Sequence, residues 1–274
     1  MKVRPLRYWL QLALTLTVCA FLVVPLVMSI LAGLTENYFI GVKSGLTLRW
    51  VGEVWSLYHE TIWRSIYVAL GTLVVTFVLG IPAAYALARA QSRWTRLIEE
   101  LITLPIAVPG LATALALILL YGGWRDFRAS WFFILVGHVL FTLPFMVRSV
   151  LAVMMAVDLK TLEEAAASLG ASFRERFVSV VLPNVRPGIL AGSLMVVTLS
   201  MGEFNLTWML HTPLTKTLPV GLADSYASMR LEIGSAYTLI FLFMIVPLLI
   251  GMQWASNSLT LGLRSRSERG SGRG

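Results

Sequence analysis

The sequence predicts an all-α, polytopic membrane protein with six transmembrane helices. Of its 274 residues, 57% are hydrophobic and only 13% are charged, whereas about 25% of the residues in a typical soluble domain are charged. The charges lie between long uncharged stretches, each close to the roughly 20 apolar residues with which a helix crosses a bilayer. Helices are expected because the backbone finds no water to bond inside lipid. Composition therefore excludes a soluble domain.

Six stretches with few or no charges are the expected crossings. They run over residues 8–35, 65–88, 101–124, 129–147, 187–215 and 233–263. The first is longer than the apolar core of a signal peptide, about 7–15 residues, so we expect a retained signal-anchor helix. Arg148 is expected to mark the inner end of the fourth helix. The external loop 37–61 is expected to carry a short interfacial helix.

Basic residues predict the orientation, since loops on the cytoplasmic side of a membrane carry an excess of Lys and Arg. With the N-terminus inside, 15 of the 22 Lys and Arg residues fall in inner segments. We therefore expect both termini in the cytoplasm and the chain in the inner membrane of a bacterium. This orientation explains the net charge of +8 without a nucleic-acid partner. The expected domains are a cytoplasmic N-terminus (1–9), a transmembrane domain (10–263) and a disordered basic cytoplasmic tail (264–274).

The inner loop of residues 156–187 is the most informative segment, because it is long and yet has helical periodicity. Four apolar residues recur at helical spacing and form one face: Leu162, Ala165, Ala166 and Leu169. Gly170 then breaks the helix where a left-handed cap fits. A second period follows over residues 173–180, until Pro183 and Pro187 end it and start the next crossing. The loop is predicted to form a helix, a turn and a second helix, and this element could bind a partner protein.

The same loop resembles the EAA motif of ABC-importer permeases. Glu164-Ala165-Ala166 is followed after three residues by Gly170, after nine more by Val180, and after one more by Leu182-Pro183. The family pattern has Ile where this chain has Val180. Three further segments resemble these permeases, namely GIPAAYALAR from Gly80, LPIAVPG from Leu104 and TLPVGL from Thr217. The resemblance implies the six-helix fold of type I ABC importers, the MetI-like permease fold.

The resemblance also implies partners and residue roles. It implies a second permease subunit, expected here to be a different chain, two ATP-binding-cassette ATPase subunits and an extracytoplasmic solute-binding protein. The implied ATPase-coupling residues are Glu164, Ala165, Ala166, Gly170, Leu182 and Pro183. Small alanines would let the helix dock closely in a groove of the ATPase, and Glu164 would pair with a basic residue there. The alternative is that the two alanines only stabilise the helix, since Ala is the best helix former.

No motif of the sequence predicts nucleotide, metal or cofactor chemistry in this chain. The phosphate-binding pattern G-x-x-x-x-G-K-[ST] does not occur. His59, His138 and His211 lie in different segments, and Cys19 is the only cysteine. We expect no catalytic, cofactor-binding or metal-binding residues here, with ATP and Mg²⁺ bound by the partner ATPase. This also argues against a membrane enzyme.

Glu203 is the main candidate for the translocation path. A charge at bilayer depth costs roughly 2.5–3.5 kcal/mol on insertion scales, so it should face a cavity or a partner. It lies in the stretch SMGEFNLTW with Asn205 and Trp208, and these three residues are the predicted substrate pathway or gate. The alternative is a packing role, in which Glu203 pairs with His138 or Asn205. His138 itself is either a hydrogen-bonded packing residue or a group that titrates during transport.

The cargo is predicted only by class. The sequence resembles permeases for polyamines, aminoalkylphosphonates, ferric iron and sulfate. We expect a polyamine or an aminoalkylphosphonate, with sulfate, thiosulfate or ferric iron as the alternative. Glu203 does not decide between them, because a similar Gly-Glu-Phe stretch occurs in sulfate-type permeases, whereas polyamine permeases usually carry an aspartate-bearing version. A stand-alone secondary transporter or channel is a different class of function, and the motif loop argues against it.

Overall fold

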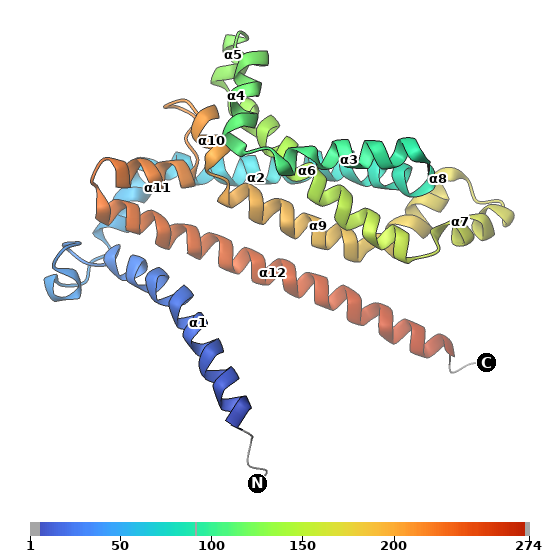
Figure 1. Ribbon diagram of the computed structural model, residues 1–274, viewed down its shortest axis with the longest axis horizontal. Coiled ribbons are helices and arrows are strands. Elements are labelled where there is room, and N and C mark those ends of the chain that lie inside the picture. Colours follow the sequence, from blue (N-terminus) through green and yellow to red (C-terminus); the bar gives the residue numbers. More distant parts are fainter. Residues whose placement is uncertain (1–5, 91, 272–274) are drawn as a thin grey trace. The chain divides into compact units, whose positions relative to one another are not determined.

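The computed structural model describes the backbone of residues 6–90 and 92–271, and the side chains of residues 7–90 and 92–254. In this part of the chain the regular structure is helical, apart from one isolated antiparallel bridge between Thr35 and Leu46 (Figure 1). The elements are α1 (Leu6–Ala32), the 3-10 helix η1 (Gly41–Ser44), α2 (Arg49–Ala90), α3 (Arg93–Ala107), α4 (Gly110–Tyr121), α5 (Arg125–Ala129), α6 (Trp131–Ala156), α7 (Leu159–Ser168), α8 (Phe173–Arg176), the π-helix η2 (Phe177–Val181), α9 (Leu182–Gly202), α10 (Asn205–Leu210), α11 (Leu218–Ala227) and α12 (Leu231–Ser271).

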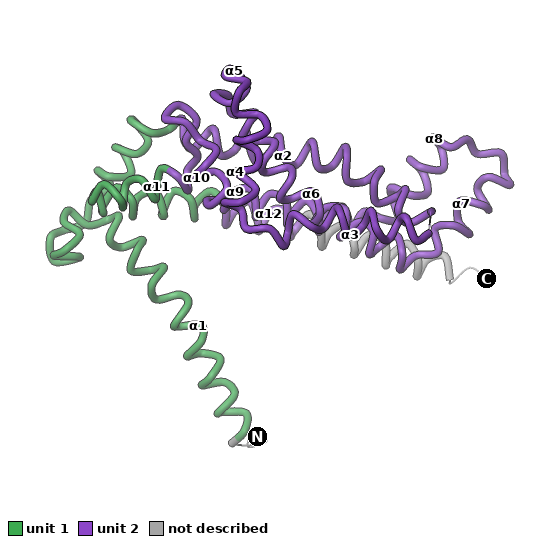
Figure 2. The backbone as a smooth tube through the Cα atoms, turned by 45° about the horizontal axis from the view of Figure 1, so that its top comes forward, with its two compact units in different colours: residues 1–59, 221–244 green, residues 60–220, 245–274 purple. Residues whose placement is uncertain are grey.

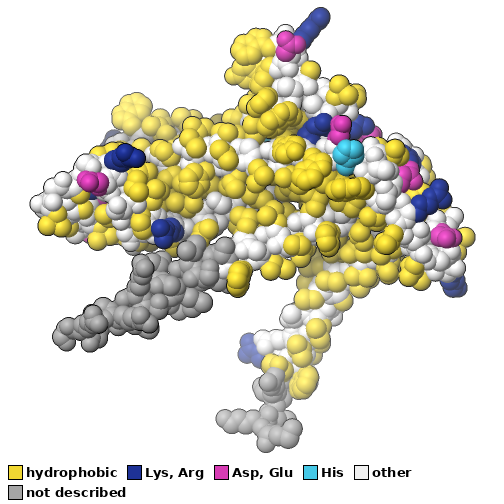
Figure 3. Space-filling model, turned by 180° about the vertical axis from the view of Figure 1, so that it is seen from behind, with side chains coloured by type: hydrophobic (Ala, Val, Ile, Leu, Met, Phe, Trp, Pro, Cys, Tyr) yellow, Lys and Arg dark blue, Asp and Glu magenta, His cyan; other side chains and the backbone are white. Residues whose placement is uncertain are grey.

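Five of the described helical segments are long and apolar enough to cross a membrane, or six if the bent pair α3–α4 counts as one span. They are α1, α2, α6, the run from α8 to α9, and α12 as far as Trp254. Apolar side chains cover most of the face drawn in Figure 3, and large ones such as Leu119 and Phe243 are almost fully exposed. Such a surface is suited to lipid or to other apolar protein surfaces. The prediction of an all-α polytopic membrane protein is confirmed.

The third expected crossing, residues 101–124, is wrong as a single helix. α3 ends at Ala107, α4 begins at Gly110, and the two helices are bent by 104°. Val108 between them is extended, with φ of −88° and ψ of 129°. A residue before proline is driven out of the helical region by the ring of that proline, here Pro109. Pro109 therefore breaks the span, whereas Pro105 lies inside α3.

Two other boundaries differ from the sequence prediction. α6 continues to Ala156, so Arg148 lies inside the helix and not at its end. α2 begins at Arg49, so the second half of the expected external loop belongs to a long helix, and the separate short helix in that loop is η1. Single charges do not end a helix, because Arg and Glu are good helix formers.

The chain forms two compact units, which Figure 2 colours separately. The first consists of residues 1–59 and 221–244. In it, a Cβ atom on Gly33 would lie 2.7 Å from the backbone nitrogen of Ala236, so α12 approaches residue 33 at backbone distance. Arg230 pairs with Glu53 at 2.7 Å. The close backbone approach and the ion pair are among the contacts that join residues far apart in sequence within the first unit.

The second unit, residues 60–220 and 245–274, is built on α6 packed along α9. Small residues allow the two helices to approach, since a Cβ atom on Gly188 would lie 2.6 Å from the backbone oxygen of Ser149. One buried apolar cluster joins α2, α6, η2 and α9 to Leu159 of α7. A second cluster joins α2, α4 and α6 to Leu206 and Leu210 of α10. The two clusters fix the elements that carry the predicted coupling and pathway residues.

Replacing Gly188 by Ala is expected to loosen the α6–α9 pair. The new methyl group would overlap backbone oxygen and cannot be relieved by a side-chain rotation, and overpacking of this kind costs about 1–3 kcal/mol. Thermal unfolding of the purified chain in detergent should show a lower midpoint. Gly251→Ala in α12 is the matched control, because nothing lies within 4 Å of a Cβ atom there. Equal midpoints for the two variants would contradict the close approach.

The expected domain boundaries stay predictions. α12 is continuous to Ser271, over a region where the sequence predicts a disordered tail from residue 264. No side chain after Trp254 is described, and residues 272–274 of that expected tail, like residues 1–5 of the expected N-terminal segment, lie outside the described residues.

Candidate coupling and pathway sites

α7 is the helix expected to couple to a partner, and local hydrogen bonds define both its ends. The Asp158 carboxylate accepts bonds from the Thr161 backbone at 3.3 Å and from the Thr161 hydroxyl at 2.6 Å. After the helix, Gly170 has φ of +86°, and the Ala171 backbone N–H donates to the Ala166 carbonyl at 3.1 Å. The left-handed turn predicted at Gly170 is confirmed.

Most of α7 is uncovered within the described chain. Its buried residues are Leu159 and Glu163, whereas the Glu164 side chain is 65% exposed. On the predicted apolar face, Leu162, Ala165 and Leu169 are exposed and Ala166 is half-buried. An apolar face that its own chain leaves uncovered is a candidate surface for another protein. The roles predicted for Glu164 to Gly170 stay predictions.

The second helix of the loop does not end at the prolines as predicted. α8, η2 and α9 form one helical run from Phe173 to Gly202, with Pro183 in the first turn of α9. The π-helix η2 lies just before this proline, where the regular hydrogen-bond pattern is interrupted. The Asn184 side-chain amide donates to the Val180 carbonyl at 2.7 Å. Leu182 and Pro183, both half-buried, therefore join the loop directly to a membrane-spanning helix.

Glu163 is a residue of this site that the sequence analysis missed. Its side chain is 2% exposed and lies 3.1 Å from the Arg89 guanidinium. The Tyr85 hydroxyl donates to its other carboxylate oxygen at 2.7 Å, and the Arg89 guanidinium donates to the same hydroxyl at 2.7 Å. The four-residue spacing places Glu163 on the same face of the helix as Leu159, but the sequence did not mark that face as buried. We call Glu163, Tyr85 and Arg89 the Glu163 clamp.

Asp158 makes the start of α7 sensitive to pH. Its hydrogen bonds with Thr161 hold the pKa of the carboxyl below its ordinary value of 3.8. A group with a depressed folded-state pKa contributes stability above its ordinary pKa, and that contribution is lost as the pH falls through the folded-state value. We therefore expect the protection factors of the amides in the first turn of α7, taken relative to the intrinsic exchange rate at each pH, to fall below about pH 3.8.

Substitution of Asp158 tests the same helix cap at neutral pH. Asp158→Ala should accelerate exchange in the same turn, whereas Asp158→Asn should not, because asparagine also caps helices well. Exchange that is unchanged in Asp158→Ala would show that the cap does not hold the helix start.

Glu203 lies in the break between α9 and α10 and not inside a continuous helix as predicted. Its backbone is extended, with φ of −71° and ψ of 121°. The carboxylate accepts hydrogen bonds from the backbone N–H groups of Leu206 and Thr207, both at 2.9 Å, and from the Thr207 hydroxyl at 2.8 Å. These N–H groups have no partner within a helix that starts at Asn205. Glu203 thus satisfies the first turn of α10.

His138 of α6 completes a buried polar network around this break. One ring nitrogen lies 2.8 Å from the Ser200 hydroxyl and the other 2.7 Å from the Thr207 hydroxyl. The Glu203 carboxylate is 4.0 Å from the second nitrogen. Both ring nitrogens of His138 therefore have hydrogen-bond partners, and the network links α6, α9 and α10.

The three predicted pathway residues do not share one environment. Asn205 and Trp208 are exposed on α10, and the Trp208 ring lies 5.3 Å from that of Phe204. The Glu203 side chain is only 9% exposed. Glu203 therefore lies beside Thr207 and His138 on the buried face of α10, whereas Asn205 and Trp208 lie on its exposed face. The pathway or gate role of the three residues stays a prediction.

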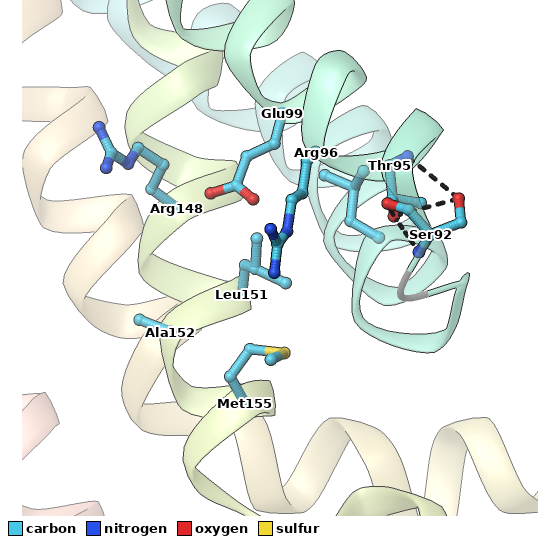
Figure 4. Close-up of a pocket in the computed structure, with 9 residues that line it drawn as sticks. Ser92, Thr95, Arg96, Glu99, Arg148, Leu151, Ala152 and Met155 are labelled. Carbon is cyan, nitrogen blue, oxygen red and sulfur yellow. Dashed lines mark hydrogen bonds between the residues drawn. The ribbon is translucent and has the colours of Figure 1, made fainter.

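A cavity of about 520 Å³ lies between α3 and α6 (Figure 4). Arg96 and Glu99 reach it from α3 and Arg148 from α6, beside the apolar Leu151 and Met155. Arg148 therefore lines a cavity instead of marking a helix end. Groups of both signs face this space, so its charge alone selects neither an anion nor a cation. Within the described residues, no group of three or more His, Cys, Asp or Glu could hold a metal ion.

Comparison with known sequences identifies relatives over most of the chain. The family described as binding-protein-dependent transport system inner membrane component matches residues 77–260. The sulfate transport system permease protein CysW of Synechocystis sp. is 30% identical, over 70% of this chain and 75% of its own length. The putrescine transport system permease protein PotI of Escherichia coli (strain K12) is 27% identical, over 80% of this chain and 81% of its own.

Solved structures show the same fold. A chain of the bacterial ABC transporter that imports the acidic polysaccharide alginate superimposes with a TM-score of 0.72, at 15% identity, over 93% of this chain and 97% of that one. A chain of the inward-facing MetNI methionine ABC transporter gives 0.61, at 16% identity, over 77% of this chain and 97% of that one. The MetI-like fold implied by the motif loop is therefore confirmed. The chain belongs to the binding-protein-dependent transport system inner membrane component family, and is a multi-pass permease of the ABC-importer class.

Proposed function

We propose that this permease forms the translocation path for a small polar solute and is driven by two ATPase subunits, one of which docks on α7. The observation that carries the proposal is the uncovered face of α7, with exposed Glu164 and Leu169 and the left-handed turn at Gly170. ATP and Mg²⁺ would bind to the ATPase subunits, because this chain carries no nucleotide-binding motif. Its own role would be mechanical and not enzymatic.

The helical run after the turn supports this coupling role. Displacement of α7 and the turn would act on α8, which continues through η2 into α9 without a break. α9 in turn packs along α6 through Gly188 and Gly192. A push at the loop would therefore reach two membrane helices through rigid, close-packed contacts.

The proposed assembly contains a second permease chain, different from this one, and a solute-binding protein on the outer side. Both termini would be cytoplasmic in the inner membrane, as the distribution of Lys and Arg predicts. A structural relative was solved as an alginate ABC transporter in complex with a periplasmic protein carrying an alginate pentasaccharide, which supports a binding-protein partner of this kind.

For the cargo we propose a polyamine or an aminoalkylphosphonate, and the likeness to the putrescine permease supports the polyamine. Sulfate or thiosulfate is the second candidate, because the sulfate permease is similar over a comparable share of its length; ferric iron has no comparable support among these relatives. Glu203 does not favour a cation, since its carboxylate is already occupied by the backbone N–H groups of Leu206 and Thr207.

The test is solute-stimulated ATP hydrolysis by the reconstituted complex. The chain would be purified with its co-expressed partners, placed in lipid vesicles with the binding protein, and offered putrescine, 2-aminoethylphosphonate, sulfate, thiosulfate or ferric iron in turn. Stimulation by either of the first two compounds supports the proposed cargo, and stimulation by sulfate or thiosulfate alone supports the second candidate. Flux without nucleotide, or the absence of any associated ATPase, would overturn the proposal in favour of a stand-alone transporter or channel.

A further inference from the structure

The attachment of α7 to the rest of its unit depends on very few side chains. Only Leu159 and Glu163 of the helix are buried. Leu159 makes an apolar contact, which can slide. Glu163 makes charge-assisted contacts with Arg89 at 3.1 Å and Tyr85 at 2.7 Å, and such contacts fix direction as well as distance. The Glu163 clamp is therefore the directional, charged contact between α7 and α2.

Tyr85 connects the clamp to the second helix of the loop as well. Its ring lies 5.3 Å from the Phe177 ring, almost perpendicular to it, and 6.1 Å from the Phe173 ring. Edge-to-face pairs at such distances are favourable. α7, the α8–η2 segment and the end of α2 thus meet at one tyrosine, and a cavity of about 440 Å³ beside them is lined by the same Tyr85, Arg89 and Glu163.

Glu163 and Glu164 are adjacent, yet they face opposite surroundings. The Glu164 side chain is 65% exposed and pairs at 4.0 Å with Lys160, whose side chain is 81% exposed. The Glu163 side chain is 2% exposed and its partners belong to α2. One carboxylate is therefore free to meet a partner protein, while the other is committed to this chain.

We propose that Glu163 is a positioning residue for coupling, which transmits the displacement of α7 to α2 through Arg89 and Tyr85. This inference rests on the proposed function, in which an ATPase moves α7, and adds a second route into the membrane beside the one through α8, η2 and α9. Without the charge of Glu163, α7 can still dock on its partner but moves without carrying α2 with it.

The experiment measures solute transported per ATP hydrolysed in reconstituted vesicles, together with the amount of ATPase that co-purifies with the permease. Glu163→Gln removes the charge and keeps the size of the side chain. The ratio is expected to fall about tenfold, within the usual range of coupling between sites, while the amount of co-purified ATPase is unchanged. Glu100→Gln, at an exposed position of α3, is the matched control and should leave the ratio as in the wild type.

Exchange of the charges provides the rescue. Arg89→Glu alone places two carboxylates together and should lower the ratio, whereas Arg89→Glu with Glu163→Arg restores an ion pair and should recover much of it. A purely structural role would lower the thermal midpoint and the co-purified ATPase along with transport, and that result would overturn the proposal. A wild-type ratio in Glu163→Gln would overturn it as well.

If the wild-type complex shows no solute-stimulated hydrolysis, the proposed function fails and this inference fails with it. If the wild-type complex is stimulated and Glu163→Gln keeps the wild-type ratio, the inference alone is overturned.

Discussion

Replacing Gly170 by Val is expected to remove most of the solute-stimulated ATP hydrolysis. Gly170 has φ of +86°, and no atom lies within 4 Å of a Cβ atom built on it. The barrier to substitution is therefore conformational and not a clash with neighbours. A left-handed conformation costs an ordinary residue about 1–2 kcal/mol, and a β-branched residue is a genuine outlier there. With Val at position 170 the backbone would leave the left-handed conformation, and the exposed face of α7 would point in another direction.

The loss should be about tenfold or more, because each 1.4 kcal/mol changes an equilibrium about tenfold. Gly170→Asn is the conservative variant, since asparagine tolerates the left-handed region, and it should keep most of the stimulation. Gly41→Val tests for general strain, because Gly41 has φ of +67° and is equally open but lies outside the loop. Stimulation in Gly170→Val within about twofold of the wild type would show that the turn geometry is not required.

Replacing Glu203 by Leu is expected to give the largest loss of stability. The backbone N–H groups of Leu206 and Thr207 would lose their acceptor, and both residues are buried. Each buried polar group left without a partner costs about 1–3 kcal/mol. For a chain of this size the thermal midpoint should fall by about 5–10 °C. The measurement is thermal unfolding of the purified permease in lipid discs.

Two further variants separate packing from a role in the pathway. Glu203→Gln keeps one carbonyl oxygen as an acceptor, so its midpoint should lie between those of the wild type and Glu203→Leu. Asn205→Ala, on the exposed side of α10, should leave the midpoint unchanged. Glu203→Gln with a wild-type midpoint and strongly reduced transport would contradict the packing explanation and favour a direct contact with solute or a gate.

The two tests probe features that the sequence predicts to different degrees. A left-handed glycine between two apolar periods is a local property, so the turn at Gly170 could be read from neighbouring residues alone. The function of Glu203 could not be read in this way. An acid in an apolar stretch indicates that some partner must exist, but the partner proved to be the backbone of α10, which exists as a separate helix only because the chain is extended at residue 203.

The same distinction applies to the breaks in the expected crossings. Hydropathy places an apolar stretch at residues 101–124, and it cannot tell one straight helix from two helices bent by 104°. The Val108-Pro109 pair is a local signal for the break. Pro183 is an equally strong local signal, yet the helical run passes through it. The π-helix η2 precedes this proline, and the Asn184 side-chain amide donates a hydrogen bond to the Val180 carbonyl.

The sequence by itself determined the fold class, the positions of the apolar stretches, the helix–turn–helix loop and its resemblance to importer permeases. Each of these depends on periodicity, composition and spacing along the chain, which are local properties. Only the tertiary structure decided that Glu163 is buried against Arg89 and Tyr85 while Glu164 is exposed. Two identical side chains in adjacent positions differ only in the direction each takes from the helix axis, and contact with α2 decides which of those directions is buried.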